Sequence, residues 1–298
     1  MPIESYLTEE DLNIKDLSLE QPRDESGLEF DVNREITKED WQKMKEYLET
    51  ATKDKLQSNF LKVASAMLLL FPERKSELGL TEEKWQKCVK LVAKELQEHL
   101  SIRTMLLAQL KQLYPEKFLE MPPELAEELT WTPALPLEVS KMVDEGMKDF
   151  SPLHLAAEAK TTFPEIDFGR NFSRVHIKQL AQMIEREKEL RRTAIKGNPI
   201  QPKATWGGIV AHIAKFRILF PEYVDDVAIT KADLKGIKKS MAEDRRRNDY
   251  AYLAIVASNL KMALAEKVVP TDNGLVIVDR KEPKLNELAG PLPQTKKF

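Results

Sequence analysis

Apolar residues recur at three- and four-residue steps along most of this chain, the pattern typical of amphipathic helices. One such stripe consists of Phe60, Val63, Ala64, Met67, Leu68 and Phe71, and the next of Trp85, Cys88, Val89, Val92 and Leu96. Alternating, strand-like patterning is confined to Leu275–Val278, which follows the turn-forming Asp272-Asn273-Gly274. The pattern therefore predicts a helical protein with one short strand near its end.

Further helical patterns follow at intervals along the chain. They cover His99–Leu113, a short Leu125–Leu129, Leu137–Phe150, Leu153–Thr161, Ser173–Lys196, Thr205–Leu219 and Asp244–Lys267. Between them, Met121–Leu137 is rich in proline and Gly197–Pro202 reads as a second connector.

The helical pattern is also repeated at a longer interval. Aromatic-Pro-Glu occurs at Phe71, Tyr114, Phe163 and Phe220, with steps of 43, 49 and 57 residues, and Leu264-Ala265-Glu266 follows 44 residues later without the proline. After Phe71, Phe163 and Phe220, a hydrophobic-Thr/Ser pair comes nine to ten residues on. This spacing indicates units of two helices each.

Each part of the unit has a physical reason. The residue before a proline is disfavoured in helical conformation, and proline offers no amide donor, so the aromatic residue ends a helix. Thr37, Thr81 and Thr230 are good N-caps for the helix that follows, and the nearby acidic residues suit its positive end.

A two-helix unit of this length with a proline between its helices resembles the HEAT and armadillo class of helical repeats, from about Ile36 to Val269. The resemblance implies an all-α fold, a right-handed α-solenoid-like array of about five irregular helical hairpins. Its concave face, built from the second helices, would bind another macromolecule. Arrays of this class bind peptides, proteins or nucleic acids and are seldom enzymes. Because the steps between the repeated motifs are unequal, a compact irregular bundle is the alternative to an open array.

The same patterns divide the chain into four parts. Residues 1–34 form an acidic arm, 35–136 the N-terminal helical repeats, 137–270 the C-terminal helical repeats and 271–298 a tail.

Composition narrows the class of protein. There are 10 glycines where average usage near 7% would give roughly 20, which disfavours glycine-dependent nucleotide-binding sheets. With one cysteine there is no internal disulfide and no cysteine-built zinc site. The longest apolar run, Val63–Phe71, is far shorter than the roughly 20 residues of a membrane helix, and Met1–Glu20 is acidic, unlike a signal peptide. We expect a soluble protein of the cytoplasm, without membrane contact.

Catalytic and metal-binding patterns are not evident, so we expect no enzyme, no metal and no cofactor. His154 and Glu158 share a helix face, but a metal site needs a third ligand. Cys88 lies on an apolar stripe and is expected to be a buried, inert thiol. Thr205-Trp206-Gly207-Gly208 offers amides to an anion at a helix start, although close helix packing explains the glycines equally well. Trp41, Trp85, Phe71, Phe163 and Phe220 are expected in the core.

Charge is the more informative feature. Residues 1–149 carry 20 Lys and Arg against 31 Asp and Glu, a net of −11, whereas residues 150–298 carry 26 against 18, a net of +8. The basic residues of the second half form a strip that we identify as the candidate contact surface: Lys188, Arg191, Arg192, Lys196, Lys235, Lys238, Lys239, Arg245, Arg246 and Arg247.

Three interpretations of this strip remain open. It is a solvated helix face, or it binds a phosphate backbone with Tyr250 and Tyr252 stacking nearby, or it attracts the acidic half within one molecule or between copies. We therefore expect a non-enzymatic scaffold that binds a protein or peptide through a groove or a charged face. The alternative is a nucleic-acid-associated factor that uses the basic strip, and the sequence leaves the oligomeric state open.

Overall fold

The computed structural model describes residues 31–53, 57–95, 100–119, 134–193 and 205–278. These residues are mostly helical with one small sheet, which confirms the predicted all-α class. The long helices come in five consecutive pairs: α2 (Lys38–Lys53) with α3 (Gln57–Leu70), α4 (Glu82–Glu95) with α5 (Leu100–Leu113), α8 (Ala134–Asp144) with α9 (Ser151–Thr162), α10 (Arg174–Thr193) with α11 (Trp206–Leu219), and α12 (Lys231–Arg246) with α13 (Tyr250–Leu264).

Shorter elements complete the described chain. They are α1 (Val32–Glu35), α6 (Pro115–Leu119), the 3₁₀ helices η2 (Pro72–Leu78), η3 (Phe168–Asn171) and η4 (Pro221–Val227), and the strands β1 (Lys267–Thr271) and β2 (Gly274–Val278). The predicted helix Leu125–Leu129 lies outside the described residues.

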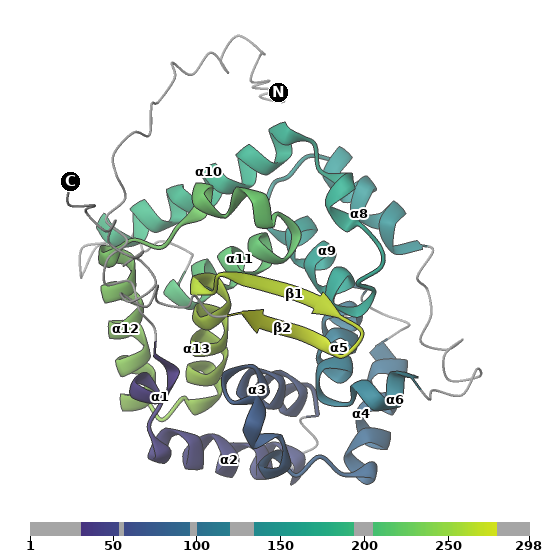
Figure 1. The fold of residues 1–298 in the computed structure, drawn as a ribbon, viewed down its shortest axis with the longest axis vertical. Coiled ribbons are helices and arrows are strands. Elements are labelled where there is room, and N and C mark those ends of the chain that lie inside the picture. Colours follow the sequence, from purple (N-terminus) through teal and green to yellow (C-terminus); the bar gives the residue numbers. More distant parts are fainter. Residues whose placement is uncertain (1–30, 54–56, 96–99, 120–133, 194–204, 279–298) are drawn as a thin grey trace, which may run out of the picture.

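The second helices of the five pairs form a closed ring. Each packs against the next in the order α3, α5, α9, α11 and α13, and α13 packs against α3 and α2 again (Figure 1). The first helices of the pairs lie on the outside of this ring. The stack is therefore closed on itself and differs from the open curved array that the repeat resemblance implied.

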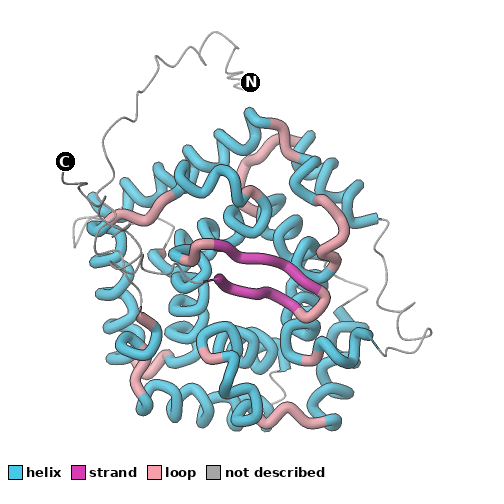
Figure 2. Tube along the Cα trace, in the orientation of Figure 1, coloured by secondary structure: helices cyan, strands magenta, loops and turns pink. Residues whose placement is uncertain are grey.

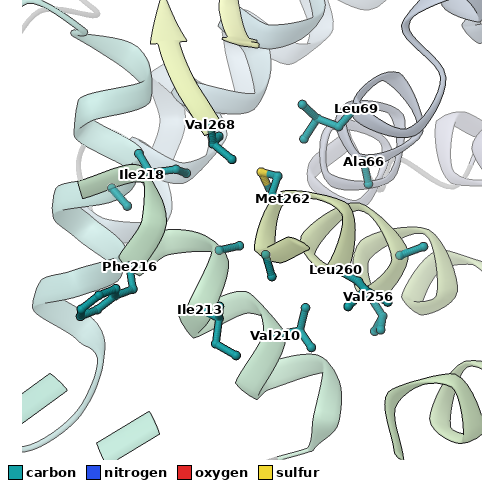
Figure 3. Close-up of a cluster of buried hydrophobic side chains, with 14 of the residues drawn as sticks. Ala66, Leu69, Val210, Ile213, Phe216, Ile218, Val256, Leu260, Met262 and Val268 are labelled. Atoms are coloured by element: carbon teal, nitrogen blue, oxygen red, sulfur yellow. The ribbon is translucent and has the colours of Figure 1, made fainter. Parts of the chain in front are cut away.

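The ring encloses a continuous apolar core. Side chains from several inner helices meet there, and Figure 3 shows Ala66 and Leu69 of α3, Ile218 of α11 and Met262 of α13 gathered near Val268 of β1. The predicted core residues Trp41, Trp85, Phe71 and Phe220 are buried, and Phe163 is half-buried against the core. Burial of this apolar surface is the main driving force for the closed arrangement.

The aromatic-Pro-Glu segments behave as predicted. Phe71 and Phe220 each still donate a backbone N–H to the carbonyl four residues back, and the following proline then starts η2 or η4. Thr230 and Asp233 form a capping box at the start of α12, and Thr37 and Asp40 exchange the same two hydrogen bonds before α2.

A cation three residues before the aromatic position links the inner helices. Lys111 of α5 donates to the Thr162 carbonyl oxygen at the end of α9, over 2.7 Å. Arg217 of α11 donates to the Ala265 carbonyl oxygen just after α13, and Lys261 of α13 donates to the end of α3. A cation at these carbonyl ends satisfies free acceptors and opposes the negative end of the helix dipole.

The two oppositely charged halves meet at the seam of the ring. Arg245 of α12 makes a bidentate ion pair with Asp40 of α2, with nitrogen–oxygen distances of 2.9 Å, and Lys238 pairs with Glu35 of α1. The attraction between halves that the sequence left as one interpretation thus occurs within one molecule at these two pairs.

The two strands form an antiparallel hairpin that lies across the ring, in front of its centre in the view of Figure 2. Lys267 pairs with Val278 and Thr271 with Gly274. Gly274 has φ +94°, and a Cβ there would lie 2.4 Å from Oε1 of Gln112 in α5, so glycine is required at this turn. β1 was not expected, and residues 271–278, assigned to the tail from the sequence, belong to this hairpin.

One predicted helix is divided in two. The expected Asp244–Lys267 helix breaks after Arg246, because Asn248 adopts a left-handed φ of +57° and Asp249 caps α13 by accepting from the Tyr252 amide. Asn followed by Asp is a break signal that the apolar spacing concealed. The helix expected over Leu137–Phe150 similarly ends at Asp144, two residues before Gly146 with φ +92°.

Candidate functional site

An open groove of about 620 Å³ lies beside the hairpin, between two successive aromatic-Pro-Glu turns. Its walls come from the end of α9, from η3 and the start of α10, from the end of α11 with η4, and from β1. Pro164 and Pro221, the prolines of the two turns, both line it. The prolines of both turns therefore border a surface hollow, together with Phe220 and Glu222 of the second turn.

The bottom of the groove is apolar. Phe172, Phe220 and Ile177 line it and are at least nine-tenths buried, as are Ile218 and Val268. The rings of Phe172 and Phe220 pack edge to face with their centroids 5.3 Å apart. An apolar floor fixed in this way presents a preformed surface to a ligand.

The rim of the groove is mainly cationic. Lys160, Arg170, Arg174 and Lys267 line it, against Asp167 and Glu222. Lys160 is held by the carbonyl oxygens of Pro164 and Ile166, and Arg170 pairs with Asp167 at 2.9 Å. Arg174 and Lys267 are exposed and have no ion-pair partner among the residues that the structure describes. These two cations are therefore available to an anionic ligand.

One wall of the groove is the outer side of β1. β1 pairs with β2 on one side only, and Val268, Val269 and Pro270 line the groove. Pro270 has no N–H, so this strand is a poor template for the addition of a further strand. Side-chain contacts and charge, rather than strand pairing, are the means by which the groove can hold a ligand.

The basic strip is only partly available for contact. Lys188 is 1% exposed and contacts Glu185 and Asp233 together with the Ala228 carbonyl oxygen. Arg192 makes a bidentate pair with Asp233, at 2.6 and 2.8 Å. Burial alone would raise the pKa of Asp233, but hydrogen bonds from Arg192 and Thr230 hold that pKa below its ordinary value.

The other residues of the strip also fall into two groups, those with an ion-pair partner and those without. Lys238 and Arg245 hold the seam, and Arg247, just after α12, pairs with Glu243 of that helix. Four described strip residues have an exposed or half-buried side chain and no such ion pair: Arg191, Lys235, Lys239 and Arg246. Lys196 lies outside the described residues. Whether this remainder contacts a partner stays a prediction.

A half-buried polar cluster joins α9, α10 and α11. His154 Nε2 and His212 Nδ1 lie 2.8 Å apart and share one hydrogen, and Phe150 stacks on the His212 ring with centroids 3.8 Å apart. Burial lowers the pKa of His154 to about 3 and that of His212 to about 4, so both rings are neutral near pH 7. Burial also raises the pKa of Glu187, whose Oε2 lies 3.6 Å from His212 Nε2.

His154 and Glu158, which the sequence places on one face of α9, have different partners. Glu158 forms an ion pair with Lys215, while His154 faces His212. No group of three metal-ligating side chains is found among the described residues. His176 lies apart from this cluster, at the start of α10, where its amide donates to the Ser173 hydroxyl.

Two other sequence features have structural roles. Cys88 is buried, and burial raises the pKa of its thiol to about 12. Thr205 caps α11 and contacts the Tyr252 hydroxyl, and Gly207 lies against Tyr252 and Val256 of α13. Close helix packing thus accounts for Gly207, as the alternative reading held.

Sequence reasoning missed the groove and the cations that link the inner helices. A signal for these cations was present, because Lys111, Arg217 and Lys261 all stand three residues before the aromatic position or its leucine equivalent. Lys160 has the same position but donates to the carbonyl oxygens of Pro164 and Ile166 in the turn that follows it. No sequence pattern indicated the groove, because the groove depends on where β1 passes over α9 and α11.

Comparison of the chain with known protein families, with curated proteins and with solved structures found no match. In the described part of the chain, no helix has the length and apolar character needed to cross a membrane.

Proposed function

We propose that this protein is a non-enzymatic binding protein that holds a short acidic, partly apolar segment of a partner protein in the groove beside β1. The observation that carries the proposal is the combination of a buried apolar floor with Arg174 and Lys267 at the rim. Apolar side chains of the partner would contact the floor and its carboxylates the two cations, so that apolar burial supplies affinity and charge supplies orientation.

The chemistry of the lining supports binding rather than catalysis. Among the described residues that line the groove, no hydrogen bond links a nucleophile to a base: Asp167 is engaged by Arg170, and the Lys160 ammonium donates to the Pro164 and Ile166 carbonyl oxygens. The half-buried histidine pair lies away from this lining. Covalent catalysis needs a nucleophile activated by a neighbouring base within hydrogen-bond reach.

We further propose that the five helix pairs are copies of one ancestral unit of the HEAT or armadillo kind, and that the protein works in the cytoplasm. Two pairs share one internal contact, between a tryptophan four residues after the capping threonine and the aromatic residue just after the second helix, with ring centroids 5.3 Å apart in each case: Trp41–Phe71 and Trp85–Tyr114. A single buried thiol suits a reducing compartment.

Fluorescence anisotropy with a labelled peptide of alternating Leu and Glu tests the binding proposal. We expect binding to the full chain, and at least tenfold weaker binding to Arg174→Glu and Lys267→Glu. Lys239→Glu, an equal charge change on α12 outside the groove lining, is the matched control and should bind like wild type. Equal weakening in all three variants, or equally tight binding of a Leu-Lys peptide, would contradict the proposal.

The nucleic-acid alternative now depends on Arg191, Lys235, Lys239 and Arg246. Titration with RNA and with duplex DNA across a salt series tests it, because phosphate contacts weaken steeply with salt. Absence of binding at low salt removes this alternative. Charge reversal at Lys188 or Arg192 is not a useful probe, since both residues hold Asp233 inside the protein.

A further inference from the structure

The chain carries an acidic segment of its own outside the described residues. Residues 1–30 contain nine Asp and Glu against two Lys and Arg, whereas residues 279–298 contain three against five. The lining of the groove has four cations against two carboxylates. Charge complementarity therefore favours residues 1–30, and not the C-terminal residues, as a ligand of the groove.

Within residues 1–30, one stretch combines acidic and apolar side chains at close spacing. Leu7-Thr8-Glu9-Glu10-Asp11-Leu12-Asn13-Ile14 has three consecutive carboxylates flanked by leucines. This is the composition that a groove with an apolar floor and a cationic rim accepts. The leucines suit the half-buried apolar side chains of the lining, Val269, Pro270 and Tyr223. The carboxylates suit Arg174 and Lys267.

The stretch is long enough to reach the groove from where the described chain begins. Residue 31 caps α1, which is fixed to α12 through Glu35 and Arg245. The 20 residues that separate Asp31 from Asp11 span up to about 65 Å when extended. A compact protein of this length has a radius of gyration of only about 19 Å, so most of the surface is within range.

We propose that residues 7–14 occupy the groove of the same chain and compete there with the partner segment, an inference that rests on the proposed function. A tethered ligand of this kind acts at an effective concentration in the millimolar range. A free acidic peptide binds only the chains whose groove is empty. Its apparent association constant is therefore the intrinsic constant multiplied by the fraction of such chains.

Competition in the full-length protein tests the occupancy. The probe is a labelled peptide with the sequence of residues 7–14, and the variant is Glu9→Gln/Glu10→Gln/Asp11→Asn. We expect the variant to bind the probe about tenfold more tightly than wild type, because its own segment no longer competes. Asp24→Asn/Glu25→Gln/Glu29→Gln removes the same charge elsewhere in the segment and should bind like wild type.

The outcomes separate the two proposals. If wild type and the residue 9–11 variant bind the probe equally, self-occupancy is overturned while the groove remains a binding site. If neither chain binds the probe, nor the Leu-Glu peptide, the proposed function itself fails. An equal gain in affinity in both triple variants would show general repulsion rather than occupancy, and would also overturn the inference.

Carbodiimide cross-linking locates the segment directly. The carbodiimide adds to a carboxylate and gives an activated ester. Nζ of a lysine then attacks the carbonyl carbon and forms an amide, and the reagent leaves as its urea. In an equal mixture of unlabelled and ¹⁵N-labelled full chain, we expect Lys267 joined to Glu9, Glu10 or Asp11 within one isotope label, and no such product from Lys267→Arg. A product of mixed label would place the segment of a second copy in the groove and overturn occupancy within one chain.

Discussion

Lys261 of α13 donates from Nζ to the carbonyl oxygen of Leu70 at the end of α3, over 3.1 Å and across 191 residues of sequence. It also donates to the Leu69 carbonyl oxygen at the same distance. The last inner helix is thereby bound to the free carbonyl end of the first. This contact has the same form as that of Lys111 with the end of α9, so the seam of the ring is built like an internal joint.

Removing the Lys261 ammonium should weaken the seam. Lys261→Met keeps much of the apolar stem but leaves the two carbonyl oxygens without this donor, and we expect the free energy of unfolding to fall by about 1–3 kcal/mol. Urea denaturation measures the change. Lys239→Met, at an exposed lysine of α12, should remain within about 0.5 kcal/mol of wild type. Equal stability of both variants would show that Lys261 does not hold the ring closed.

The pair of Arg245 and Asp40 predicts an acid-dependent seam. Burial alone would raise the pKa of Asp40, but hydrogen bonds from Arg245 and the Thr37 amide hold that pKa below its ordinary value. A lowered carboxylate pKa stabilises the fold above the unfolded-state pKa near 3.9, and this contribution is lost as the pH falls through the folded-state pKa.

Arg245→Gln/Asp40→Asn should therefore lose less stability than wild type when the pH falls through that range. Thermal melts at a series of pH values, with both single variants to complete the cycle, measure the difference. The single variants should each be less stable than the double variant, because each leaves one partner of the pair uncompensated. Parallel pH profiles for wild type and the double variant would contradict the prediction.

The half-buried pair of His154 and His212 predicts a second pH dependence, at higher pH. Burial lowers the pKa of His154 to about 3 and that of His212 to about 4, whereas an unfolded histidine has a pKa near 6.5. The unfolded state binds more protons between these limits, so stability falls as the pH drops below about 6.5. From pH 7 to pH 5 the two rings should remove about 2–4 kcal/mol. Urea denaturation of His154→Gln/His212→Gln should show a shallower fall, and an unchanged slope would contradict the assignment.

Two adjacent glycines of α11 should respond oppositely to the same substitution. A Cβ at Gly207 would lie 2.3 Å from Oη of Tyr252 and 2.8 Å from Val256, so Gly207→Ala must push α11 away from α13. We expect a loss of about 1–3 kcal/mol. A Cβ at Gly208 would meet only Oγ1 of Thr205, at 3.6 Å, and Gly208→Ala should be neutral or stabilising by up to about 1 kcal/mol. Thermal melts compare the two, and equal effects would refute close packing at Gly207.

Much of the local structure could be predicted from the sequence, because its causes are local. Thr37 and Thr230 cap their helices through atoms three residues away, and Pro72 and Pro221 end the preceding helices through steric effects on one neighbour. The break at Asn248 was missed although its cause is also local, because the apolar spacing continues across it.

The candidate site could not be predicted in the same way. Exposed and buried cations look alike in sequence, since both occur on helices with a charged face. Lys188 and Arg192 proved to be internal partners of Asp233, which lies 41 residues after Arg192, and the groove is assembled from four separate stretches of chain.

The sequence alone determined the helical class, the paired helices and the opposite charges of the two halves, because periodicity, capping and composition act over a few residues. Only the tertiary structure decided that the stack closes, through Lys261 and Arg245, and where β1 lies beside α11 to form the groove. These features depend on contacts between residues up to 210 positions apart. Such contacts form only in a fold that buries the apolar side chains and brings the opposite charges together.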